Sequence, residues 1–207
     1  MLSGLYALTD ATLTPDETLF EQVAQAILGG VRIVQLRDKT RTDVQLYDIA
    51  LALQKLCAAH QVCFIINDRL ALAQKINADG LHMGQHDLGF KLARVEFPNK
   101  IMGMSCYGNI DNALIFQEEG ADYVAFGACF NSPTKPLAKV IPPNLFREAK
   151  KRLRIPTCAI GGITLENAPQ LIQQGVDMVA VISDLWGSDN ITLQAQGYRE
   201  LFGKPLP

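Results

Sequence analysis

Polar side chains recur directly after short apolar runs throughout this chain. Carboxylates follow two of these runs, Asp68 in NDR and Asp87 in GQHD, and cations follow others at Arg37, Lys39 and Lys135. One or two carboxylates, completed by water and substrate phosphate, are the usual ligands of Mg2+. Cations beside such a metal indicate a polyanion. These residues therefore predict a site for a metal-bound diphosphate.

A second anion site is predicted by the last two apolar runs. One ends in Gly161 and Gly162, and the next ends in Ile182 and Ser183. Backbone N–H groups can approach an oxyanion closely where no side chain stands in the way. This pattern suits a monophosphate. The remaining polar positions at the ends of apolar runs are Gln35, Asp38, Asn67, Ser105, Ser132 and Thr134.

Each group also has a plainer explanation. Arg37 to Lys39 could be a solvated charged loop, and Gly161-Gly162 could be a simple tight turn. Asp68 could cap the helix predicted at LALAQKI. Polar residues recur directly after one apolar run after another, which favours a shared site over these separate explanations.

Two other chemistries are less well supported. His82 and His86 have the i, i+4 spacing of a zinc pair, but Gly84 interrupts any helix between them. Cys106 and Cys129 could be nucleophiles, yet no histidine or asparagine is placed by sequence to activate them. The five cysteines are odd in number and mostly embedded in apolar runs, which indicates buried reduced thiols.

The elements that would position these residues alternate between two periodicities. Helical patterns such as DETLFEQVAQAILGG and DVQLYDIALALQKLCAAH separate short apolar runs typical of buried strands. GLHMG is the weakest strand pattern. The predicted strands cover residues 5–10, 31–38, 62–68, 80–84, 100–107, 123–130, 156–162 and 178–184.

Eight apolar strands alternating with helices predict an all-parallel sheet closed into a (β/α)8 barrel, with a doubly wound open sheet as the alternative. The 207 residues are close to the minimum for such a barrel, so we expect a single domain over residues 1–207. Catalytic groups of these barrels lie at the carboxyl ends of the strands.

Helix boundaries are also marked. Thr14-Pro15 and Thr164 with Glu166 are expected to open helices. The glycines expected to close helices are Gly30, Gly120 and Gly175.

Charge and composition exclude some partners. The formal net charge is -2, with 19% charged residues of both signs interspersed, which does not suit nucleic acid or an anionic membrane. No run approaches eighteen apolar residues, and the first residues lack the pattern of a signal peptide. We expect a cytoplasmic protein that acts on small-molecule substrates and that could form a homodimer.

Several segments, in this order, resemble the thiamine phosphate synthase family across residues 5 to about 185. They are QLRDK, FIINDR, ADGLHMGQHDL, IMGMSCY, GADYVAFGACFNSPTKP, AIGGIT and VAVIS. The resemblance implies a Mg2+-assisted dissociative reaction. In it, hydroxymethylpyrimidine diphosphate joins a thiazole phosphate and pyrophosphate is released.

The resemblance also implies residue roles. Asp68 and Asp87 resemble the Mg2+ ligands. The positions similar to those around the pyrimidine diphosphate are Gln35, Arg37, Asp38, Lys39, Asn67, Ser105 and Lys135. The positions similar to the thiazole phosphate site are Ser132, Thr134, Gly161, Gly162, Ile182 and Ser183. Arg37, Lys39, Ser105 and Lys135 are the expected catalytic residues.

This chain departs from the family pattern at three positions. Ser132 replaces a frequent threonine and keeps its hydroxyl, while Asp38 and His86 stand where glutamate is common. A related tautomerase on the same barrel, a phosphate-binding protein without activity and another phosphosugar barrel enzyme are the alternatives. The first two have no use for the full set of cations and carboxylates.

Overall fold

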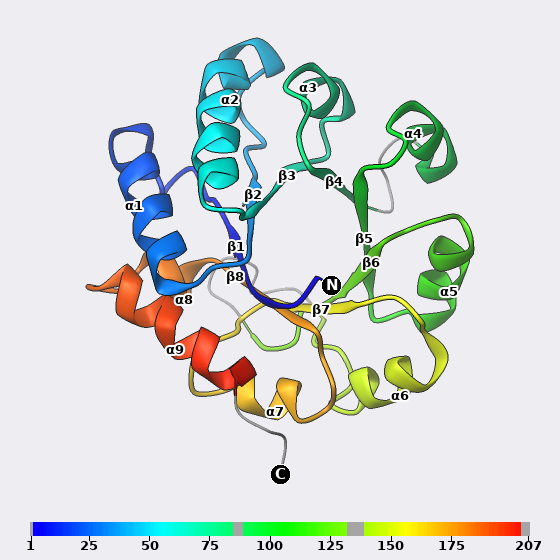
Figure 1. Ribbon diagram of the computed structural model, residues 1–207. Helices are drawn as coiled ribbons and strands as arrows, with labels where there is room; N and C mark the ends of the chain where they lie inside the picture. The colour runs from blue at the N-terminus through cyan, green and yellow to red at the C-terminus, as the bar shows by residue number, and fades with distance from the viewer. Residues whose placement is uncertain (1, 85–88, 132–138, 204–207) are drawn as a thin grey trace.

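Eight parallel strands form a closed barrel in chain order in the computed structural model, which describes residues 2–84, 89–131 and 139–203 (Figure 1). β1 pairs with both β2 and β8, so the sheet is closed and the doubly wound alternative is excluded. The predicted barrel is confirmed, including its weakest strand, GLHMG. The strands are β1 Gly4–Leu8, β2 Ile33–Leu36, β3 Cys63–Asn67, β4 Gly80–Met83, β5 Ile101–Tyr107, β6 Tyr123–Phe126, β7 Thr157–Ile160 and β8 Met178–Val181.

Helices surround the barrel on its outside (Figure 1). A short helix, α8, directly follows β8 before the last helix, α9, which packs against α1. The helices are α1 Asp16–Gly29, α2 Asp43–Ala59, α3 Leu70–Lys75, α4 Phe90–Glu96, α5 Ile110–Glu118, α6 Leu145–Arg152, α7 Ala168–Ile172, α8 Ser183–Trp186 and α9 Ile191–Gly203.

The apolar core has two layers because both faces of every strand are covered. The larger layer joins strand and helix residues, such as Val34 and Leu53, and lies between the barrel and its helices. The smaller layer consists of strand residues alone, including Tyr6, Ile65 and Tyr123, and fills the barrel interior. Burial on both faces explains why the strands have no alternating polar pattern.

Most of the predicted helix ends are confirmed. α1 begins directly after Pro15, and Gly30, Gly120 and Gly175 all have left-handed backbones, with φ of 105°, 93° and 88°. The prediction at Thr164 was wrong by three residues, since α7 begins at Ala168. The Thr164 hydroxyl instead accepts a hydrogen bond from the N–H of Asn167, and the Asn167 carboxamide accepts one from the N–H of Thr164.

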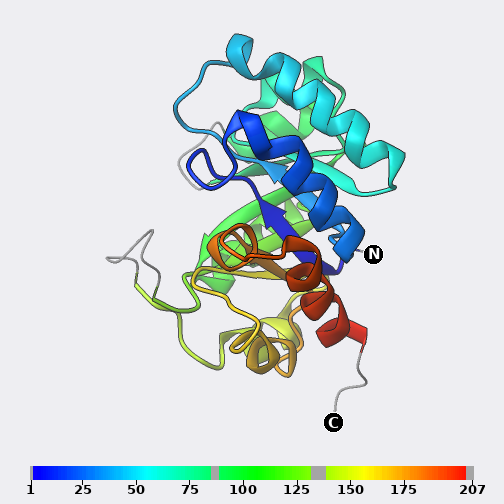
Figure 2. The same cartoon turned by 90° about the vertical axis from the view of Figure 1, so that its left-hand side faces the viewer.

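The loops after β1 and β2 lie on the same side of the barrel, at the left in Figure 2. That is the carboxyl-end side, where the candidate site residues are expected. Within the described residues, no helix is both long enough and apolar enough to cross a membrane.

Candidate active site

Strand register brings several predicted polar residues to the carboxyl end of the barrel. Gln35 lies opposite Leu8 of β1 and Ile65 of β3, and Asn67 lies opposite His82 of β4. Ser105 is on β5, where a bulge separates it from Tyr107. Gln35 and Asn67 are buried, and Ser105 is half-buried. Polar side chains at this depth need partners or a ligand.

Asp68 follows β3 in a left-handed backbone conformation with φ of 59°. Its N–H donates to the carbonyl of His82, and its carboxylate lies 3.5 Å from Lys39 Nζ. Within the described residues, no side chain caps α3, whose N-cap is Arg69. The capping role considered for Asp68 is therefore excluded, and its carboxylate lies beside a cation at the barrel mouth.

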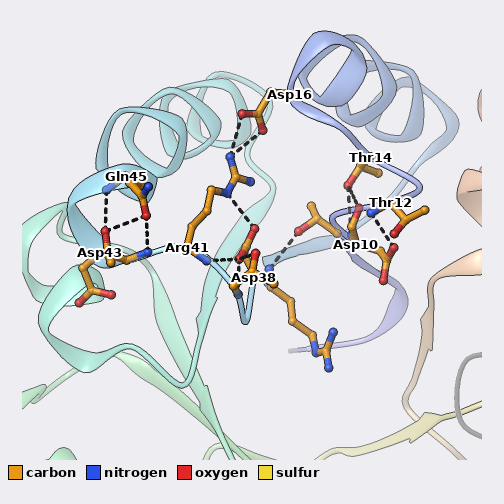
Figure 3. Close-up of polar contacts among 12 residues, drawn as sticks. Asp10, Thr12, Thr14, Asp16, Asp38, Arg41, Asp43 and Gln45 are labelled. Atoms are coloured by element: carbon orange, nitrogen blue, oxygen red, sulfur yellow. Dashed lines mark hydrogen bonds and ion pairs between the residues drawn. The ribbon is translucent and has the colours of Figure 1, made fainter.

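The loop between β2 and α2 is organised around the Asp38 carboxylate (Figure 3). This carboxylate accepts from the N–H and hydroxyl of Thr40 and from the N–H and Nε of Arg41, at 2.7 to 2.9 Å. Burial raises the pKa of Asp38, but these hydrogen bonds outweigh burial and hold the pKa well below its ordinary value. Asp38 is therefore ionised, and its carboxylate is engaged within its own loop.

Two arginines fix this loop to its surroundings. Arg41 also contacts both carboxylate oxygens of Asp16 at 2.8 Å, which joins the loop to the start of α1 (Figure 3). Arg69 donates to Asp43 and to the carbonyls of Asp38 and Arg41. The loop that carries Arg37 and Lys39 is thus held from two sides. Sequence reasoning gave neither Arg41 nor Arg69 a role.

The carboxyl end of β7 is shaped by close backbone contacts. Gly161 and Gly162 have φ of 101° and 65°, and a Cβ on Gly162 would lie 2.5 Å from the carbonyl oxygen of Asn131. The N–H of Phe130 donates to the carbonyl of Gly161. Both positions must therefore be glycine because the segment that follows β6 packs against them. A simple tight turn would not require this.

β8 ends beside β7 and leads directly into α8 at Ser183. Phosphate sites of (β/α)8 barrels are commonly built from the loops after strands seven and eight and the start of a short extra helix. Ile182 and Ser183 occupy this position.

The barrel interior holds two tyrosines that sequence reasoning missed, and they connect the predicted Gln35 to His82 and the predicted Ser105. Tyr6 and Tyr123 share a hydrogen bond of 2.9 Å between hydroxyls, Gln35 Nε2 donates to Tyr6, and Tyr123 contacts His82 Nδ1. His82 Nε2 contacts Ser105 Oγ at 2.9 Å. Burial raises the pKa of both phenols well above the ordinary value, so both are neutral.

These contacts bear on the two minor alternatives. Both ring nitrogens of His82 have hydrogen-bonding partners, Tyr123 and Ser105, while His86, the other member of the pair, lies outside the described residues. This argues against zinc at His82. Burial raises the pKa of Cys106 and of Cys129 to about 12, so both thiols are protonated at neutral pH and suit packing rather than nucleophilic attack.

Four predicted site residues lie outside the described residues: Asp87, Ser132, Thr134 and Lys135. His86 lies outside them as well. Those that the structure does describe fall into two groups at the same end of the barrel. The first group lies at or just after the carboxyl ends of β2, β3 and β5 and consists of Gln35, Arg37, Asp38, Lys39, Asn67, Asp68 and Ser105. The second group directly follows β7 and β8 and consists of Gly161, Gly162, Ile182 and Ser183.

Known proteins are similar to this chain in sequence and in fold. The family model described as thiamine monophosphate synthase matches residues 5–185. A thiamine-phosphate synthase of Wolinella succinogenes is 46% identical over 187 residues, or 89% of this chain and 86% of that protein. A thiamine-phosphate synthase of Alcanivorax borkumensis is 43% identical over 97% of this chain and 93% of that protein.

A solved structure gives the same result. The thiamine phosphate pyrophosphorylase from Pyrococcus furiosus superimposes with a TM-score of 0.88 at 32% sequence identity, covering 97% of this chain and 95% of that one. Sequence and structure agree over nearly the whole length of both proteins. The chain therefore belongs to the thiamine monophosphate synthase family.

Proposed function

We propose that the chain is a thiamine-phosphate synthase that joins 4-amino-5-hydroxymethyl-2-methylpyrimidine diphosphate to a thiazole phosphate. The products are thiamine phosphate and pyrophosphate. One observation carries this proposal beyond family membership: Gln35, Asn67 and Ser105 lie toward the carboxyl ends of β2, β3 and β5, and Lys39 pairs with Asp68 at the same end of the barrel. Such a mouth offers cations, a carboxylate and neutral hydrogen-bonding groups to a small ligand that carries a diphosphate.

The reaction needs charge stabilisation and positioning rather than a nucleophile. The bond between the pyrimidine methylene carbon and the diphosphate oxygen breaks, and its electron pair leaves with pyrophosphate. The pyrimidine amino group delocalises the positive charge, and the thiazole nitrogen lone pair forms the new C–N bond. Arg37 and Lys39 balance the charge that develops on the leaving group. Lys135, from the sequence, is proposed to join them.

The donor set suits Mg2+. Asp68 presents a carboxylate whose side chain is 27% exposed, which leaves its oxygens accessible to a hydrated cation. Mg2+ ordinarily takes one or two protein carboxylates and keeps water and phosphate as its other ligands. Asp68, together with Asp87 from the sequence, would hold it. When bound, Mg2+ supplies neutralisation of the diphosphate charge.

The second substrate is proposed to be held by its phosphate at the ends of β7 and β8. Gly161, Gly162, Ile182 and Ser183 would supply the backbone there, with Ser132 and Thr134 adding hydroxyls. A remote phosphate contact fixes the thiazole nitrogen in line with the reacting carbon and lowers the entropy lost in the reaction step.

Asp38 acts indirectly in this proposal. Its carboxylate accepts four hydrogen bonds from Thr40 and Arg41, so it organises the loop. We assign it the positioning of Arg37 and Lys39 on either side of it. The Arg37 N–H donates to the hydroxyl of Thr9, which ties the loop to the end of β1.

A cytoplasmic location is proposed from the cysteines. All five are free thiols, and four of them are buried. Unpaired buried thiols suit a reducing compartment.

The test is pyrophosphate release by the purified protein. The pyrimidine diphosphate is supplied with and without thiazole phosphate, and with and without Mg2+. We expect release that requires both the thiazole phosphate and the metal, with thiamine phosphate formed in equal amount. Absence of release under every condition would overturn the proposal. Release without Mg2+ would overturn the metal assignment alone.

A further inference from the structure

A continuous set of hydrogen bonds crosses the barrel interior from β2 to β5. We call Gln35, Tyr6, Tyr123, His82 and Ser105 the interior network. Gln35 Nε2 donates to Tyr6 OH at 2.5 Å. Three contacts of 2.9 Å follow: Tyr6 to Tyr123, Tyr123 to His82 Nδ1, and His82 Nε2 to Ser105 Oγ. The network joins residues of β1, β2, β4, β5 and β6.

The position of Tyr123 is built into the backbone around it. Its ring lies where a side chain of residue 103 would be, since a Cβ on Gly103 would lie 2.0 Å from Tyr123 Cζ and 2.3 Å from its hydroxyl oxygen. The ring also stacks on His82, with centroids 5.5 Å apart and planes at 28°, and meets Tyr6 edge-on. The phenol is therefore held in one place.

Donation by Gln35 to Tyr6 favours one direction of hydrogen bonding through the interior network. The Gln35 amide donates to the Tyr6 oxygen, so the Tyr6 hydroxyl hydrogen is available for Tyr123, and the Tyr123 hydrogen is available for His82 Nδ1. A neutral imidazole that accepts at Nδ1 carries its hydrogen on Nε2 and donates it to Ser105 Oγ. The Ser105 hydroxyl hydrogen then remains available to a ligand.

The opposite end of the interior network offers an acceptor. Gln35 is only 1% exposed, and within the described residues its Oε1 atom is buried and has no hydrogen-bonding partner. Leaving a buried acceptor without a partner is unfavourable, so this atom points to a group that is satisfied when a ligand binds. The network therefore presents an acceptor at Gln35 and a donor at Ser105.

We infer that Tyr6, Tyr123 and His82 are positioning residues that fix the acceptor of Gln35 and the donor of Ser105 for the synthase reaction. This inference rests on the proposed function. The aminopyrimidine has an N–H group for the acceptor, and the departing diphosphate has oxygens for the donor. The amino group becomes a stronger donor as positive charge develops on the ring, while the leaving group becomes a stronger acceptor. Both ends therefore bind the transition state more tightly than the substrate.

The first variant is Tyr123→Phe, which keeps the ring and removes the hydroxyl between Tyr6 and His82. We expect kcat to fall about tenfold or more, because the Ser105 hydroxyl is no longer oriented. The control is Tyr198→Phe, since Tyr198 is equally buried and its hydroxyl donates to Asp184 at 2.6 Å outside the barrel interior. We expect its kcat to remain within about twofold of the wild type. An equal loss in the two variants would overturn the inference.

A double variant tests whether Tyr123 acts through Ser105. Tyr123→Phe should lower kcat in the wild-type background but have little further effect in Ser105→Ala, because coupled residues are not additive. A full tenfold loss in the Ser105→Ala background would refute positioning through the hydroxyl. Thermal unfolding of each variant separates loss of fold from loss of activity.

Nitrogen NMR of the imidazoles tests the interior network without any substrate. The chain has three histidines, so a His82→Asn variant assigns the resonances. We expect the neutral Nε2–H form of His82 in the wild type and a loss of that preference in Tyr123→Phe. A wild-type Nδ1–H form would overturn the deduced direction. An inactive protein with the expected NMR result would refute the proposed function and leave the hydrogen-bond network standing.

Discussion

The two sides of the barrel mouth are built by different means. Next to β2 and β3, side-chain interactions fix the loop: Asp38, Arg41 and Arg69 hold it through hydrogen bonds and ion pairs. At the end of β7, close backbone packing fixes the conformation, because Gly161 and Gly162 leave room for residues 128–131. The first arrangement depends on charge. The second depends on shape, so the same kind of substitution should affect the two sides differently.

The largest effect is expected from Gly162→Ala on the β7 side. The new Cβ would lie 2.5 Å from the Asn131 carbonyl oxygen at a φ of 65°. Overpacking of this kind costs about 1–3 kcal/mol, and a left-handed backbone adds about 1–2 kcal/mol. We expect chemical unfolding to show a loss of about 2–5 kcal/mol and steady-state kinetics to show a higher KM for the thiazole phosphate.

Gly203→Ala is the control, because no atom of the described residues outside its own helix lies within 4 Å of its added Cβ. Unfolding free energies that are equal for the two variants would contradict the shape requirement at β7. A raised KM for the pyrimidine diphosphate alone would place the effect on the wrong side of the mouth.

Asp68→Asn tests the charge requirement on the β3 side. The substitution keeps the shape and removes the negative charge beside Lys39. We expect the Mg2+ concentration for half-maximal rate to rise about tenfold or more, with the unfolding free energy changed by less than about 1 kcal/mol. Asp111→Asn is the control, since that carboxylate pairs with Arg152 and is 78% exposed. A Mg2+ titration identical to that of the control would remove Asp68 from the metal site.

The smallest effects separate the two contacts of Arg41. Arg41→Gln removes its ion pairs with Asp38 and Asp16, so we expect KM for the pyrimidine diphosphate to rise about fivefold as the loop carrying Arg37 and Lys39 loosens. Asp16→Asn weakens only the more exposed pair and should change KM less than about twofold. The reverse order in steady-state kinetics would show that the link to α1, rather than Asp38, holds the loop.

The sequence predicted strands, barrel and family because each rests on local patterns or motifs. An apolar run predicts a strand, and Gly30, Gly120 and Gly175 predict helix ends, from only a few neighbouring residues. Thr164 misled because its hydroxyl serves a turn that precedes α7. The side-chain partners of Asp38 could not be inferred either, since a charged loop residue gives no sign of whether it faces a ligand or its own backbone.

The interior network was missed for a different reason. In LYALTD and YVAFGACF, the tyrosines are indistinguishable from ordinary apolar strand residues, and Tyr6 and Tyr123 are 117 positions apart. Their contact exists only after the barrel closes. The only signal for the network is that two tyrosines occupy an interior layer that branched aliphatic residues normally fill, and this is apparent only once the barrel is known.

Gly103 and Tyr123 have an evolutionary consequence as a pair. Any side chain at position 103 would overlap the ring at position 123, so position 103 can accept a side chain only after that ring is lost. A lineage that gains a side chain at position 103 must also lose the phenol, and with it the connection between Gln35 and Ser105. Such a change needs two substitutions in a fixed order, position 123 before position 103, and the first of them already breaks the interior network.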